Sequence, residues 1–143
     1  MPYQLPNVPA SISVPEGWAR STAGAAVTFT DKLNSIVLTS TPGTSAPTVA
    51  TARQVTVPQL QGSVPAFKLL DVTTVQRKSG AAVLVHYQAD SAPNSVTGKV
   101  IRDDVQRYEF FHGGTEVDVT LSGPVNADNV DPWKTVTDSL QWK

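Results

Sequence analysis

The chain has 143 residues, of which 40% are hydrophobic and 16% charged, so it is long enough to bury a core in a single domain spanning residues 1–143. Its net charge of −1 offers no excess of Lys or Arg for nucleic acid or an anionic membrane, and the absence of cysteine excludes disulfides and thiolate metal sites. The longest apolar run, Ala81–Val85, is far shorter than the roughly 20 residues that span a bilayer, which predicts no transmembrane segment.

The opening of the chain is expected to be extended. Prolines recur through the first fifteen residues, and proline disfavours helical geometry in the residue before it. Within this region Ser11–Val14 is predicted to form a short edge strand. The first residues lack the basic stretch and apolar run of a secretory signal. We therefore expect a cytoplasmic protein, or an extracytoplasmic one if a leader has been removed.

A first hairpin and a helix come next. Ala26–Thr30 and Ser35–Thr41 are rich in β-branched residues and flank a polar turn, which predicts two paired strands. Apolar residues at helical spacing then follow Thr48, a suitable N-terminal cap. Because Pro58 clashes with the carbonyl four residues before it, we expect this helix to kink or stop near Val57.

Two further hairpins follow the helix. The second pairs Phe67–Gln76 with Ala81–Gln88, and the third pairs Lys99–Phe111 with Thr115–Ser122. Gly113-Gly114 supplies the positive φ angles that a two-residue hairpin turn needs, and so we interpret it as a turn rather than a phosphate loop.

Two patterns concern how these strands face the core. From residue 116 to residue 121, Glu, Asp and Thr alternate with Val and Leu, which is typical of a sheet with one face in water. Val105 has the opposite parity to Tyr108 and Phe110, and a β-bulge near Arg107 would return all three to a common core face.

The C-terminal region predicts a second helix. Asp131 and Pro132 suit a helix start, and Trp133, Val136 and Leu140 form one apolar stripe. Together these elements predict an α+β fold, with an antiparallel sheet of about six to seven strands flanked by two or three helices.

Catalytic and metal-binding motifs are not recognisable. His86 and His112 lack metal-site spacing, and they would bind a metal only if they met across neighbouring strands beside Asp118, so we predict no metal. Ser122 lies in no nucleophile elbow. No glycine-rich loop indicates a cofactor. The three tryptophans are assigned to core packing.

Carboxylates likewise provide no recognisable catalytic pair. Asp103, Asp104 and Glu109 are predicted to be solvated, because adjacent strand residues point to opposite faces and cannot flank one bond. We therefore predict no catalytic residue and no enzyme.

Several segments, in their order and spacing, resemble actinobacterial lipoproteins of the LpqN/LpqT type. These are Ile12–Trp18, Phe29–Asn34, Thr97–Lys99 followed by Arg107–Phe110, and Asp128–Trp133. That family is similar to the PsbP-like superfamily, which includes DcrB and the Eag chaperones. The resemblance implies an α/β/α sandwich and a non-catalytic binding or accessory domain of the bacterial cell envelope. The chain lacks the signal and lipobox cysteine of a lipoprotein, which leaves membrane anchoring open.

Three functions follow as hypotheses. The first is docking of a protein or apolar ligand, with Tyr87, Tyr108, Phe110 and Phe111 as contact residues, since aromatics of both parities cannot all face one core. The second is a dimeric, chaperone-like protein that shields apolar segments of a partner. The third is a small hydrolase using Ser122 or a histidine, which has the weakest support.

Overall fold

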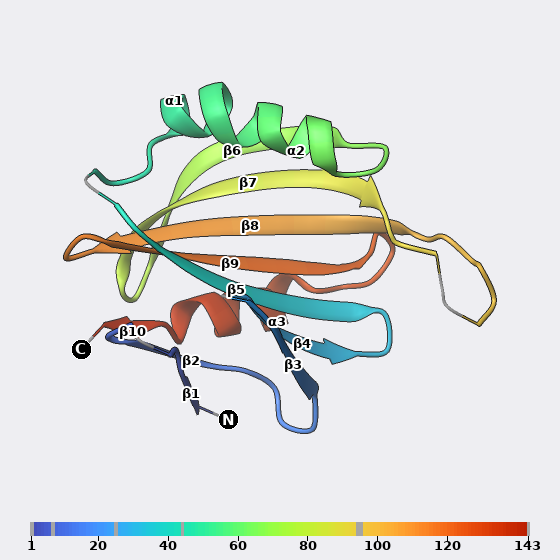
Figure 1. Cartoon of the computed structure of the whole chain (residues 1–143), viewed down its shortest axis with the longest axis horizontal. Helices are drawn as coiled ribbons and strands as arrows, with labels where there is room; N and C mark the ends of the chain where they lie inside the picture. The colour runs from blue at the N-terminus through green and yellow to red at the C-terminus, as the bar shows by residue number, and fades with distance from the viewer. Residues whose placement is uncertain (1, 7, 25, 44, 94–95, 143) are drawn as a thin grey trace.

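The structure is a computed structural model that describes residues 2–6, 8–24, 26–43, 45–93 and 96–142. It has three layers (Figure 1). A large antiparallel sheet lies in the middle. A helical segment covers part of one face, and a second helix with a small three-stranded sheet covers the other. The predicted α+β architecture is confirmed.

The large sheet has seven strands and contains all three predicted hairpins. Gly113 and Gly114 have φ of +57° and +81°, the positive values predicted for the third hairpin turn. The first strand of this third hairpin begins at Arg102, three residues after the predicted start at Lys99. In spatial order the strands are β3 (Ala19–Ala23), β4 (Ala26–Asp31), β5 (Asn34–Pro42), β9 (Thr115–Pro124), β8 (Arg102–His112), β7 (Gly80–Asp90) and β6 (Lys68–Arg77).

The first helical segment runs through Pro58 instead of stopping there. It comprises α1 (Val49–Thr51), the π-helical turn η1 (Ala52–Thr56) and α2 (Val57–Ser63), and Thr48 caps it as predicted. In the π turn the N–H of Val57 donates to Ala52 O, five residues back. Pro58 is the second residue of α2, which follows the π turn directly. Of the two predicted outcomes, a kink or a stop near Val57, the stop is wrong, and the irregularity at this position is the π turn that ends at Thr56.

The opposite face is covered by α3 (Val130–Asp138) and by a small sheet of β1 (Pro2–Gln4), β2 (Ala10–Ser13) and β10 (Gln141–Trp142). The stripe predicted for α3 is buried. Asn129, rather than Asp131, occupies the N-cap position of α3. Strand β2 was predicted to be an edge strand, but it lies between β1 and β10 because the two ends of the chain pair with it.

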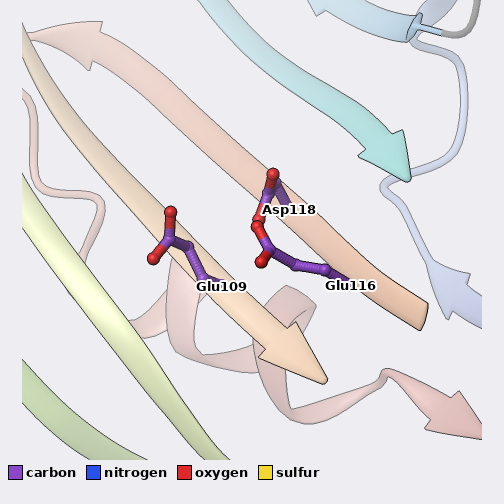
Figure 2. A group of neighbouring side chains, drawn as sticks. All are labelled: Glu109, Glu116 and Asp118. Atoms are coloured by element: carbon purple, nitrogen blue, oxygen red, sulfur yellow. The ribbon is translucent and has the colours of Figure 1, made fainter. Parts of the chain in front are cut away.

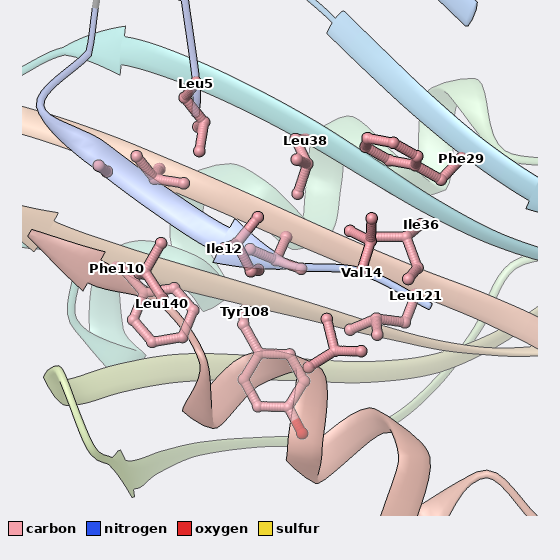
Figure 3. Packing of buried hydrophobic residues seen from close by; sticks show 14 of the residues in the cluster. Leu5, Ile12, Val14, Phe29, Ile36, Leu38, Tyr108, Phe110, Leu121 and Leu140 are labelled. Atoms are coloured by element: carbon pink, nitrogen blue, oxygen red, sulfur yellow. The ribbon is translucent and has the colours of Figure 1, made fainter. Parts of the chain in front are cut away.

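The large sheet separates two hydrophobic cores, and this explains the mixed parity of β8. Val105 packs in the core under the first helical segment, whereas Tyr108 and Phe110 pack in the core against β2 and α3 (Figure 3). The pairing of β8 with β7 and β9 runs without a register shift. The bulge predicted near Arg107 is therefore wrong. Among the described residues, no helix is long and apolar enough to cross a membrane.

Candidate functional site

Three carboxylates meet on one face of the β8–β9 hairpin (Figure 2). Thr56 of the first helical segment contacts Glu109 on this face. The two-residue turn sets the register so that Glu109 lies directly opposite Asp118, with Glu116 two residues before Asp118 on β9. One carboxylate oxygen from each residue lies within 4.8 Å of the other two. We call Glu109, Glu116 and Asp118 the acid cluster.

Arg107 holds two of these carboxylates together. Its Nε donates to Glu109 Oε2 at 3.1 Å, and its Nη2 donates to Asp118 Oδ2 at 3.0 Å. Thr56, the last residue of η1, also donates from its hydroxyl to Glu109 Oε2 at 3.4 Å. The π turn therefore connects the helical segment directly to the acid cluster, as π turns at functional sites often do.

The buried carboxyls do not share the ordinary acidity of exposed ones. Glu109 and Asp118 are 4% and 5% exposed. Burial, together with a hydrogen bond with Glu116, raises the pKa of Asp118 to about 8, against the opposing charge of Arg107. Burial also raises the pKa of Glu109, again against the charge of Arg107. Asp118 consequently retains its proton near neutral pH.

A cleft opens beside the acid cluster, between the helical segment and the hairpin. It consists of two cavities of about 310 and 280 Å³, and Ala46, Pro47 and Glu109 line both of them. The larger one also reaches Glu116, and the smaller one reaches Phe111. We call this the helix-side cleft. It combines a charged floor with apolar walls, a composition typical of binding sites.

The donor set of the acid cluster suits cations rather than covalent chemistry. Carboxylate oxygens are ligands that Ca²⁺, Mg²⁺ and Mn²⁺ prefer. Glu109 and Asp118 each keep an oxygen that Arg107 does not engage, and Glu116 is half-buried at the cleft. These three residues are the ones that could hold a metal ion in the described part of the chain.

The four predicted contact aromatics do not form one surface. Tyr87, Tyr108 and Phe110 are 5%, 2% and 1% exposed and belong to the two cores. They were placed on the surface because a single core was assumed, whereas the sheet is covered on both faces. Phe111 is half-buried and lines the helix-side cleft directly opposite Glu116. Of the four, it alone is accessible to a partner.

The histidines and the candidate serine engage different partners. His86 Nε2 lies 2.7 Å from Asp104 Oδ1, and the His112 ring contacts the Trp142 ring in a tilted arrangement with centroids 5.3 Å apart. The hydroxyl of Ser122 pairs with that of Ser35 on β5 at 2.6 Å. These contacts assemble neither a histidine pair nor a serine–histidine pair from the described residues.

The acid cluster was missed by sequence reasoning. Glu109 was predicted to be solvated, and Asp118 was assigned to a wet face, yet both are buried. The alternation on β9 was correct, but the helical segment and the Arg107 side chain cover that face. A usable signal was present, because a two-residue turn at Gly113-Gly114 necessarily sets Glu109 opposite Asp118.

No family model and no curated protein matches the chain. Among solved structures it is similar to cyanobacterial PsbP (CyanoP) from Synechocystis sp. PCC 6803, with 17% identity, a TM-score of 0.65, and coverage of 100% of this chain and 92% of that one. LpqN of Mycobacterium tuberculosis, described as involved in cell envelope biogenesis, matches with 13% identity and a TM-score of 0.59 over 92% of this chain and 82% of LpqN.

The Ran-binding protein Mog1p of Saccharomyces cerevisiae matches with 12% identity and a TM-score of 0.61, covering 99% of this chain and 94% of Mog1p. A Bacteroides thetaiotaomicron structure is longer, and the chain spans 45% of it. Identities this low establish the fold alone. Taken with the seven-stranded antiparallel sheet and its helices, these likenesses show that the chain has a PsbP-like α+β fold.

Proposed function

We propose that the chain acts as one non-catalytic accessory domain that docks a protein partner at the helix-side cleft. The observation that carries this proposal is the position of Phe111, which is half-buried at the cleft while the other three candidate aromatics are enclosed in cores. An aromatic side chain offers a large contact area at a low cost in conformational entropy, which is why such residues recur in interfaces.

The surroundings of Phe111 support this role. Its ring lies close to Gly43, where even a Cβ atom would approach it to 3.3 Å, so the ring is seated against backbone. Val55 on η1 is 54% exposed and lines the adjoining cavity. Two apolar side chains therefore flank the charged floor, and a partner's apolar residue can bury itself between them.

The comparisons support an accessory function over an enzymatic one. PsbP, LpqN and Mog1p share the fold with this chain. LpqN is involved in cell envelope biogenesis, and Mog1p is a Ran-binding protein. The likeness to LpqN, together with the lipoprotein resemblance of the sequence, supports a place for this docking function at the bacterial cell envelope.

A site-specific photo-crosslink tests the docking proposal. A photoreactive phenylalanine analogue at position 111 is expected to capture one defined protein in the native cells, whereas the same analogue at the exposed Val125 serves as the matched control. The purified partner should then bind Phe111→Glu at least about tenfold more weakly than Val125→Glu, since a charge would enter an apolar contact. Equal binding by the two variants would refute the proposal.

A further inference from the structure

A cavity of about 450 Å³ lies at the end of the large sheet where the β4–β5 turn and the β7–β8 loop meet, drawn at the right of Figure 1. We call it the loop-end cavity. Ser35, Ser122 and Asp103 line it from the neighbouring strands β5, β9 and β8. The pairing register places these three on the same face of the sheet as Val105, which is the face of the first helical segment.

The β7–β8 loop forms the other wall of the loop-end cavity. The N–H of Ser91 donates to Ile101 O at 2.9 Å, and the N–H of Ile101 donates to Ser91 Oγ at 3.0 Å. These two bonds close the base of the loop and fix both residues against the cavity. Ile101 and the 53% exposed Leu33 are the larger apolar side chains along the wall, so a ligand with an apolar body finds contact area there.

The floor of the loop-end cavity lacks a hydrogen-bond donor. Asp103 Oδ1 is buried and has no hydrogen-bond partner within the described ranges, and burial raises the pKa of this carboxyl. The hydroxyls of Ser35 and Ser122 lie 2.6 Å apart, so one of their two protons is used between them and lone pairs remain. Buried acceptors normally receive a donor in the native state. The floor therefore favours a ligand group that donates hydrogen bonds.

The edge of the same cavity has the opposite requirement. Lys32 from the β4–β5 turn and Lys99 from the β7–β8 loop both line it and are exposed. Neither lysine forms an ion pair with any carboxylate that the structure describes, Asp103 included. The cavity thus presents two ammonium groups at its edge and a separate, unpaired acid at its floor. A ligand that matches both carries a cationic donor and an anion at some distance from each other.

From this arrangement we infer that the loop-end cavity binds a short zwitterionic peptide whose first side chain is apolar. The N-terminal ammonium of the peptide donates to Asp103 Oδ1, and its carboxylate lies at Lys32 and Lys99. The apolar side chain packs on Leu33 and Ile101. A free amino acid holds both charges on one carbon, whereas a dipeptide separates them, which suits an acid and two lysines that are not in contact.

The dipeptide leucyl-alanine is a suitable probe, and NMR of the full chain is the readout. Titration should shift the amide signals of Ser35, Ser91 and Asp103 before those elsewhere. The shifts should saturate with a dissociation constant of about 0.1–10 mM, as expected of a small ligand in an open cavity. N-acetyl-leucyl-alanine lacks the ammonium and leucyl-alanine amide lacks the carboxylate, so each should bind at least about tenfold more weakly.

Two variants test the protein side of the same contacts. Asp103→Asn keeps the shape and an acceptor oxygen but loses the charge, and it should bind leucyl-alanine at least about fivefold more weakly. The double variant Lys32→Gln with Lys99→Gln should weaken binding at least about tenfold. Its matched control is Lys68→Gln with Lys78→Gln, which removes two exposed lysines outside the cavity and should leave the affinity unchanged.

Three outcomes would each overturn the inference: no saturable shift up to about 50 mM peptide, equal affinity for the peptide and its two blocked forms, or equal affinity of the two double variants. The inference goes beyond the docking proposal and concerns the opposite end of the β8–β9 hairpin. Phe111→Glu should bind leucyl-alanine as the wild type does, so either proposal can fail alone.

Discussion

Substitution of Asp118 by Asn should remove a pH-dependent cost from the free energy of folding. Asp118 is 5% exposed, lies opposite Glu109 and keeps its proton at neutral pH, because burial raises its pKa to about 8. Asn has nearly the same shape, carries no charge, and can donate to Glu116 as the protonated acid does. The variant therefore keeps the contacts of the folded state while it eliminates the titration.

The sign and size of the effect follow from linkage. In the unfolded chain Asp118 ionises near its ordinary pKa of 3.8, whereas in the folded protein it stays protonated up to about pH 8. Between these values the folded state binds more protons, so the stability contributed by this group falls as pH rises and then levels off. The interval spans about four pH units at about 1.4 kcal/mol each, which sets an upper limit of about 6 kcal/mol. Relaxation around the buried group should reduce this to about 1–3 kcal/mol.

Urea denaturation of both proteins from pH 4.5 to pH 9, with a chelator present, measures the difference. We expect Asp118→Asn to match the wild type near pH 4.5 and to exceed its free energy of unfolding increasingly up to about pH 8. Asp31→Asn, at the exposed β4–β5 turn, is the control for loss of one negative charge. If Asp118→Asn is instead less stable at every pH, the carboxylate is ionised and stabilised by Arg107, and the reasoning is wrong.

Three further predictions concern the packing of the sheet, each measured as a change in the free energy of unfolding. Leu121→Ala removes a fully buried side chain and should cost about 2–5 kcal/mol, whereas a smaller loss would mean the core relaxes around it. Gly123→Ala places a Cβ 2.5 Å from Asn34 Oδ1 and should cost about 1–3 kcal/mol, and unchanged stability would show that Asn34 moves freely. Arg77→Lys loses the 2.8 Å bond from Nε to the Thr137 hydroxyl and should cost about 1–2 kcal/mol, unless Lys reaches Thr137 equally well.

Local signals predicted the hairpins and the helices. Alternation identified the paired strands, two glycines identified a turn with positive φ at both positions, and Thr48 identified a helix start. Each of these depends on residues within a few positions of one another. The same local signals could not predict that Pro58 is accommodated by a π turn, because the widened hydrogen-bond pattern of η1 depends on how the helix packs on the sheet.

The long-range features were beyond such reasoning. Strand β2 is central because β1 and β10, which are far apart in the sequence, pair with its two edges, and no local pattern predicts this. The mixed parity of β8 was interpreted as a bulge under the assumption of one core, although Val105 and Tyr108 simply face different cores. The same assumption placed Asp118 in water and three of the candidate aromatics on the surface.

The acid cluster is where the sequence and the fold disagree most, and that disagreement supports its functional interpretation. An apolar pair at Glu109 and Asp118 would extend the core under the helical segment without the cost of desolvating two carboxyls. The chain instead buries both acids and compensates them with one arginine. Local inconsistencies of this kind concentrate at functional sites, where stability is lost for the sake of a ligand. If Asp118→Asn stabilises the protein increasingly up to about pH 8, the burial of this acid is a cost that the fold bears at the acid cluster.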